Sequence, residues 1–180
     1  GNLPGMENYQ KLVSSRGILR SCDIFNREPR SSSPDIDFGA VHLAGGSIYC
    51  CTDALENFAH RVIDSISIPF VLVTGDADTV VSPQALGMQV FDKIVSHPTL
   101  LRWHAQNPGI EHKRLNFLPI GLDYHTMWER PGVFGGAEPQ TPFEQERALL
   151  EARCRSSAVE RRKPLLYCDW HHSLSRSGRL

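Results

Sequence analysis

The chain has 180 residues, 41% hydrophobic and 22% charged, with a formal net charge of −1 at pH 7. This composition is typical of one globular domain and excludes a disordered or repeat protein, while the small net charge disfavours a nucleic-acid binder. No apolar stretch has the length of a membrane span, no signal-peptide pattern opens the chain, and five cysteines without a CxxC pair indicate free thiols. We therefore expect a soluble, cytoplasmic protein.

The chain divides into three parts by the strength of its patterns. The first 45 residues are weakly patterned, with one short edge strand predicted over residues 17–22. From residue 46 to residue 173, apolar strands and amphipathic helices alternate, which predicts a single α/β domain. Residues 174–180 are polar and read as a truncated tail.

The first strand and helix of the domain are predicted from residue 47 onward. Residues 47–51 are a continuous apolar run, which predicts a buried strand. Apolar residues then recur at helical spacing over residues 55–66 and predict an amphipathic helix. Asp53 precedes this helix and Glu56 follows three residues later, the spacing of a capping box. We interpret Thr52 and Asp53 mainly as capping residues, with ligand binding as the alternative.

The second strand gives the clearest signal. Residues 68–74 are apolar without alternation, as expected for a strand covered by helices on both faces. Ser82 and Pro83 then have the order of an N-cap and first turn, and they start a helix predicted to continue to residue 95. Residues 99–105 predict another short helix, followed by a turn.

The remaining elements complete the alternation. Residues 115–120 predict a third strand, and residues 129–140, rich in Gly and Pro, predict a surface loop. A capping box at Thr141 starts a helix predicted to run toward Arg162, and residues 165–168 predict the last strand. This order predicts a Rossmann-like parallel sheet with helices on both faces.

Polar residues follow the predicted strands, at the edge where such sheets bind ligands. Asp76 and Asp78 follow the second strand, at a spacing that lets two carboxylates reach one divalent cation. Asp123 and His125 follow the third strand, and Gly121 leaves room there for a ligand to approach the backbone. His125 has the chemistry of a general base or a phosphate partner. For both groups the alternative is that the acids only cap turns and helices.

Other polar residues extend this edge. Asp169, His171 and His172 follow the last strand, so a histidine faces the same cleft if that strand end adjoins the others. His104, Gln106 and Asn107 follow Trp103 as candidates for a wall of the cleft that stacks a sugar or base, and we assign Trp103 itself to the core rather than to ligand stacking. No GxGxxG, P-loop or GxSxG motif occurs, which disfavours the common dinucleotide, NTPase and esterase sites.

Four segments taken together resemble one enzyme family. Residues 70–78 (FVLVTGDAD), 103–107 (WHAQN), 118–126 (LPIGLDYHT) and 167–171 (YCDWH) resemble exostosin-like glycosyltransferases of large DNA viruses, algae and marine bacteria. The resemblance covers residues 46–173. It implies the GT-B arrangement, two Rossmann-like halves facing a cleft, of which this chain would be the N-terminal, acceptor-side half.

The resemblance implies transfer of a sugar from a nucleotide-sugar to a glycan acceptor, with no required cofactor. His125 or Asp123 is then the expected base that deprotonates the acceptor hydroxyl. Because the family's second half does not follow, we expect the chain to be incomplete and inactive alone, and to self-associate through an exposed cleft face. The expected substrate-binding residues are Thr74, Asp76, Asn107, Gly121 and His171.

Two alternatives from other classes stay open. One is a non-catalytic module that binds a carbohydrate or a nucleotide. The other is a metal-dependent phosphate-transfer or hydrolase domain that binds Mg²⁺ or Mn²⁺ through Asp76 and Asp78, together with Asp169.

Overall fold

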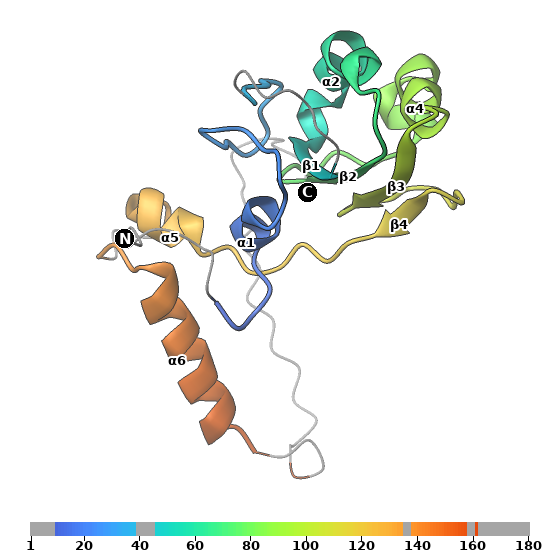
Figure 1. Ribbon diagram of the computed structural model, residues 1–180. Helices are drawn as coiled ribbons and strands as arrows, with labels where there is room; N and C mark the ends of the chain where they lie inside the picture. The colour runs from blue at the N-terminus through green and yellow to red at the C-terminus, as the bar shows by residue number, and fades with distance from the viewer. Residues whose placement is uncertain (1–9, 39–45, 135–137, 158–160, 162–180) are drawn as a thin grey trace, which may run out of the picture.

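The computed structural model describes residues 10–38, 46–134, 138–157 and 161, and the statements below concern these residues (Figure 1). Its strands are β1 (Gly46–Cys51), β2 (Phe70–Gly75), β3 (Leu100–Ala105) and β4 (Leu115–Phe117). Its α-helices are α1 (Ser15–Arg20), α2 (Leu55–Arg61), α3 (Pro83–Leu86), α4 (Met88–Val95), α5 (His125–Glu129) and α6 (Pro142–Arg155). Three short 3-10 helices are η1 (Thr52–Ala54), η2 (Ile63–Ser65) and η3 (Pro131–Phe134).

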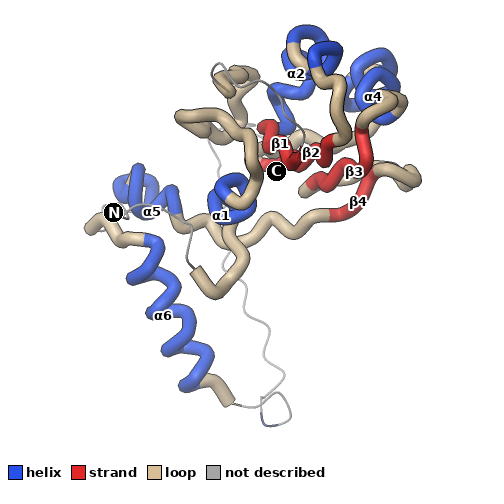
Figure 2. The backbone as a smooth tube through the Cα atoms, in the orientation of Figure 1, coloured by secondary structure: helices blue, strands red, loops and turns tan. Residues whose placement is uncertain are grey.

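The centre of the molecule is a four-stranded parallel sheet with strand order β1-β2-β3-β4. The helices that connect β1 to β2 and β2 to β3 lie together on one face of the sheet, and α1 lies on the other face (Figure 2). This arrangement confirms the predicted Rossmann-like α/β fold with helices on both faces. No helix in the described part of the chain is long and apolar enough to cross a membrane.

The hydrophobic core explains why β1 and β2 are apolar throughout. Under α2 and α4, the core includes Ile48, Cys50, Leu72, Trp103, Phe58, Phe91 and Ile94. On the opposite face, a smaller cluster contains Leu19, Cys22, Tyr49 and Val73. Neighbouring residues of β1 and β2 therefore face helices on both sides, as a continuous apolar run requires.

The strand predicted over residues 17–22 is wrong, because these residues belong largely to α1 and its end. The side chain of Ser14 caps this helix by accepting a hydrogen bond from the amide of Gly17 at 3.1 Å. The chain meets the sheet edge a few residues later, where Ile24 forms a single parallel bridge with Ile48. A capped helix of six residues leaves too short a periodic pattern to be separated from a strand.

The helix predicted over residues 99–105 is also wrong, because these residues form β3. Trp103 and Ala105 are buried beneath the helices, whereas Arg102 is exposed and His104 is half-buried. This strand therefore alternates apolar and polar residues, since only one of its faces is covered, and it lacks the continuous apolar run of β2.

Several predicted boundaries also differ from the structure. The helix predicted from Leu55 ends at Arg61 and is followed by η2, and Asp53 does not cap it but accepts a hydrogen bond from the hydroxyl of Thr79. The third strand ends at Phe117, earlier than predicted. The predicted loop after residue 129 contains η3.

At the C-terminal side, the capping box at Thr141 is confirmed: its hydroxyl accepts from the amide of Glu144, whose carboxylate accepts in return. The helix that it starts ends at Arg155, short of the predicted Arg162. The predicted strand over residues 165–168 and the polar residues after it lie outside the described residues.

The helix predicted over residues 83–95 is divided into α3 and α4 at Gly87. This residue has φ 85° and ψ 136°, a conformation close to the region that only glycine adopts readily, and a Cβ there would meet no atom within 4 Å. The break therefore depends on backbone freedom rather than on space.

We predict that Gly87→Ala lowers the free energy of unfolding by about 1–3 kcal/mol, because alanine is strained at this backbone conformation. Urea denaturation measures the loss. Gly132→Ala is the matched control, since it also meets open space but has no positive φ. Equal stabilities of the two variants would contradict the argument.

Candidate functional site

The segment after β4 returns across the sheet beneath α1 and leads to α5 (Figure 1). It is fixed there by backbone hydrogen bonds from the amide of Ser15 to the carbonyl of Leu122 (3.0 Å) and from the amide of Leu122 to the carbonyl of Val13 (2.9 Å). Gly121 has φ 79°, and a Cβ on it would lie 2.9 Å from the backbone of Ser14. The space at Gly121, predicted to admit a ligand, is therefore occupied by the chain before α1.

An ion pair connects α1 to the carboxyl end of β2. Nη1 of Arg16 lies 2.9 Å from Oδ2 of Asp76, and their side chains are only 5% and 6% exposed. The amide of Asp76 donates to Oε1 of Gln106 (2.9 Å), its Oδ1 accepts from the hydroxyl of Ser31 (2.9 Å), and its carbonyl accepts from the amide of Ser32 (2.8 Å). Asp76 adopts the left-handed conformation, φ 61°. These bonds hold an unusual backbone geometry in place.

The contacts of Asp76 bear on the predicted metal site. Its carboxylate is committed to Arg16 and Ser31, and Asp78 is exposed. Within the described ranges, no group of three or more His, Cys, Asp or Glu side chains is arranged to hold a metal ion. Asp169 lies outside these ranges, so the metal-dependent alternative stays a prediction.

Asp123 and His125 form a second polar group, next to the first. Nδ1 of His125 lies 3.0 Å from Oδ1 of Asp123, and Asp123 also accepts hydrogen bonds from the amide (2.9 Å) and hydroxyl (2.7 Å) of Thr126. The His125 side chain is 8% exposed and that of Asp123 is 51% exposed. Asp123 therefore borders the surface, and its carboxylate contacts the Nδ1 side of the buried imidazole ring, the relative position that an acid–base pair requires. The capping role and the catalytic role predicted for Asp123 are compatible.

The surroundings of Asp123 favour its ionised form. Partial burial raises the pKa of Asp123. The hydrogen bonds from Thr126 and the attraction of His125 and Arg16 together lower it by more, so the pKa lies below its ordinary value. Arg16 thus acts on both acidic groups, Asp76 by direct contact and Asp123 through its field. The result is one connected cluster, formed by side chains from α1, the end of β2 and the start of α5.

Tyr49 on β1 belongs to the same region. Its side chain is buried, and its hydroxyl has no hydrogen-bond partner in the described part of the chain. Burial raises the pKa of Tyr49, and the nearby charge of Asp76 raises it further. Tyr49 is therefore neutral, and its hydroxyl keeps its proton beneath α1.

The other predicted binding residues lie close to this edge but make structural contacts. Thr74 is fully buried, and its hydroxyl accepts from Nε1 of Trp103 at 2.9 Å, which confirms Trp103 as a core residue. Nδ2 of Asn107 donates to the carbonyl of Ala77 at 3.2 Å. His171 lies outside the described residues. These contacts connect the ends of β2 and β3 and stabilise the carboxyl edge of the sheet.

Three residues of the cluster, Arg16, Ser31 and Tyr49, were not predicted from the sequence as site residues. Gln106, predicted with Asn107 to line a wall of the cleft, follows β3 and accepts a hydrogen bond from the amide of Asp76. Its side chain packs against Gly75, where a Cβ would come within 2.3 Å of it. Gly75 is thus required for this contact.

Comparisons with known proteins give no match: no protein-family model, curated protein or solved structure resembles the chain significantly.

We predict that Arg16→Met lowers the free energy of unfolding by about 3–5 kcal/mol, because it leaves the buried carboxylate of Asp76 without its partner. The double variant Arg16→Met with Asp76→Asn should recover much of this loss, since asparagine is uncharged and tolerates the left-handed conformation. Urea denaturation of both variants measures the difference. If the losses in unfolding free energy simply add, so that the double variant is less stable than either single variant, the pairing of Arg16 with Asp76 is contradicted.

We predict that Thr126→Val raises the pKa of Asp123, because valine keeps the hydrogen bond from the amide of residue 126 but loses the one from the hydroxyl. A depressed carboxyl pKa stabilises the fold above the unfolded pKa, and this stabilisation is lost as the pH falls through the folded pKa. The variant should therefore lose less stability than the wild type on acidification below about pH 4. Carboxyl NMR titration and denaturation at several pH values measure both effects, and Thr126→Ser, which keeps the hydroxyl, should behave as wild type.

Proposed function

We propose that the chain is the acceptor-side α/β domain of a glycosyltransferase, in which His125 removes the proton from an acceptor hydroxyl. The observation that carries this proposal is the 3.0 Å contact between the half-exposed Asp123 and the buried His125, in the segment that follows the carboxyl end of β4. The resemblance of residues 46–173 to exostosin-like glycosyltransferases supports the same activity.

The chemistry follows from the orientation of the imidazole. With Nδ1 directed at Asp123, Nε2 is the basic nitrogen that accepts the proton of the acceptor hydroxyl. The acceptor oxygen forms a bond to the anomeric carbon of the donor sugar as the bond from that carbon to the phosphate oxygen breaks. The nucleotide leaves with the electron pair of the broken bond, and the carboxylate of Asp123 stabilises the imidazolium.

The polar residues around the site have two different roles, one structural and one catalytic. Arg16, Asp76 and Gln106 make their contacts within the chain. Their role is therefore to fix the carboxyl end of β2 and helix α1, next to which Asp123 and His125 lie. The nucleotide-sugar would be held mainly by a second half of the enzyme, as the GT-B arrangement implies. Cys22, Cys50 and Cys51 are buried free thiols, which favours a reducing, cytoplasmic location.

We predict that the chain binds a glycan acceptor and that His125→Gln and Asp123→Asn each weaken this binding about tenfold, because each disturbs the hydrogen bond to the acceptor hydroxyl. Saturation-transfer NMR with a panel of neutral and acidic oligosaccharides measures the affinity. His60→Gln on the exposed face of α2 is the matched control. The same samples are assayed for release of nucleoside phosphate from UDP-, GDP- and CMP-sugars.

Two results would reject the proposal. One is the absence of glycan binding at about 10 mM, a concentration at which even very weak sites are occupied. The other is Mg²⁺- or Mn²⁺-dependent binding of nucleotides that Asp78→Asn abolishes, which would instead support the metal-dependent phosphate-transfer domain. Glycan binding that neither substitution at Asp123 or His125 changes would favour a non-catalytic module.

A further inference from the structure

Helix α6 projects away from the sheet, and its buried residues and side-chain contacts with the rest of the described chain lie near its start (Figure 1). Of its 14 residues, only Pro142, Gln145 and Glu146 are buried. Nε2 of Gln145 donates to the carbonyls of Tyr124 and Gln140 (both 2.8 Å), and Oε1 of Glu146 accepts from the amide of Leu12 (2.8 Å). The later turns extend into solvent. An isolated helix of this length is marginal in water, so these turns need a packing partner.

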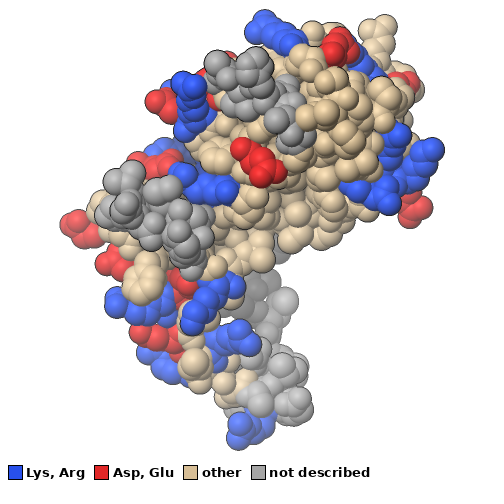
Figure 3. Space-filling model, in the orientation of Figure 1, with Lys and Arg blue, Asp and Glu red and all other residues tan. Residues whose placement is uncertain are grey.

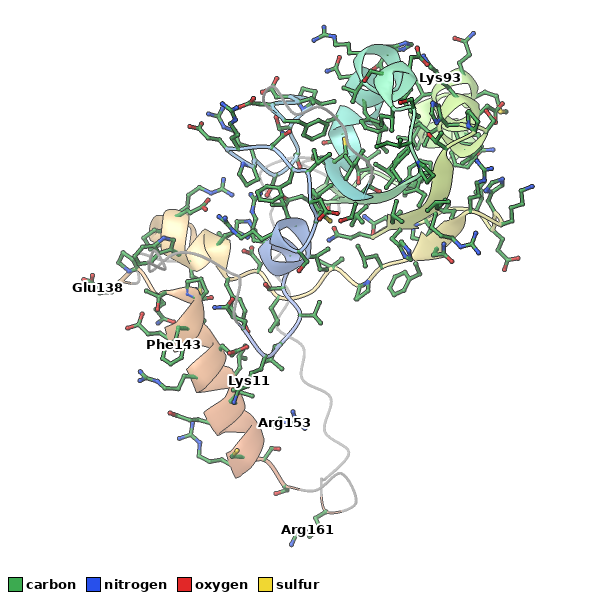
Figure 4. The ribbon with its side chains drawn as sticks, viewed as in Figure 1. Lys11, Lys93, Glu138, Phe143, Arg153 and Arg161 are labelled. Atoms are coloured by element: carbon green, nitrogen blue, oxygen red, sulfur yellow. The ribbon has the colours of Figure 1, made fainter. Side chains whose placement is uncertain are left out.

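One face of α6 carries an apolar strip. Phe143, Leu150 and Cys154 recur at i, i+7 and i+11, which places them on the same side of the helix. They line a hollow of about 590 Å³ together with Lys11. Phe143 is 65% exposed, and Figure 4 shows its side chain on the helix, away from the sheet. Exposed apolar strips of this kind mark a contact surface.

Charged residues beside the strip indicate what the partner is. Glu144, Arg147, Glu151 and Arg155 follow one another along this side of α6, so the signs alternate. Read from the other end, the same order has every sign reversed. A second α6 lying antiparallel therefore places each charge opposite its counterpart, Arg147 against Glu151 and Glu144 against Arg155, whereas a parallel copy places like charges together. Figure 3 shows basic and acidic side chains interspersed over α6.

We propose that α6 is a homodimerisation helix, which pairs antiparallel with α6 of a second copy and buries Phe143, Leu150 and Cys154 at the contact. The pattern is self-complementary, as a two-fold symmetric interface requires. Two helices of this length bury less area than the roughly 1,200–2,000 Å² of a stable interface, so the dimer is weak, with a dissociation constant of about 10–100 μM. This surface differs from the cleft face considered from the sequence and is independent of the glycosyltransferase proposal.

Sedimentation velocity from about 5 to about 500 μM tests the pairing, since this range spans the expected dissociation constant. The wild type should change from monomer to dimer. Leu150→Ser and Phe143→Ser should remain monomeric, and far-UV circular dichroism checks that both keep their fold, because neither residue is buried.

A charge exchange tests the antiparallel register. Arg147→Glu should weaken the dimer at least tenfold, because it sets a new carboxylate against Glu151 at two symmetric positions. Adding Glu151→Arg should restore the wild-type constant, since the opposite signs face each other again. Arg61→Glu, on the exposed surface of α2, is the matched control. A wild type that is monomeric at about 500 μM overturns the proposal. A dimer whose dissociation constant is the same in the Arg147→Glu variant as in the wild type also overturns the proposal.

Discussion

The ion pair between Arg16 and Asp76 is the contact on which the candidate site depends. Both side chains are almost inaccessible to water, so each charge is tolerated only because the other is present. The pair holds α1 against the carboxyl end of β2. Since the segment before α1 is hydrogen-bonded to Leu122, the same contact fixes the position from which Asp123 and His125 follow. The buried ion pair thus helps to fix the position of Asp123 and His125.

This arrangement divides the polar residues at the strand ends by function. Thr74, Asp76 and Asn107 satisfy donors and acceptors of the chain itself, whereas the carboxylate of Asp123 is half exposed and contacts the buried imidazole of His125. A polar residue at the end of a parallel strand is therefore as readily part of the scaffold as of the ligand site. Buried polar groups must be hydrogen-bonded, and at this edge the partners come from β3, from the loops after β2 and β3, and from the segment around α1.

The elements that could be predicted from the sequence are those with a complete local pattern. The apolar runs of β1 and β2 and the capping box at Thr141 each reflect one local requirement, and all three were found. In contrast, β3 is covered on one face only, and α1 is a single short helix attached by an ion pair. Arg16 and Asp76 lie far apart in the chain and leave no periodic signal, so their partnership could not be predicted, whereas Asp123 and His125 stand directly after a predicted strand.

The attachment of α1 also has a consequence for the order of folding. The units β1-α2-β2 and β2-α4-β3 connect neighbouring strands through short loops, so their contacts form early. Helix α1 leaves the ribosome before β1 and β2, yet its docking surface, made by Tyr49 and Val73, exists only once these two strands have paired. We therefore expect the N-terminal segment to dock late and to open before the sheet unfolds. A chaperone or protease that samples the partly open protein would meet this segment first.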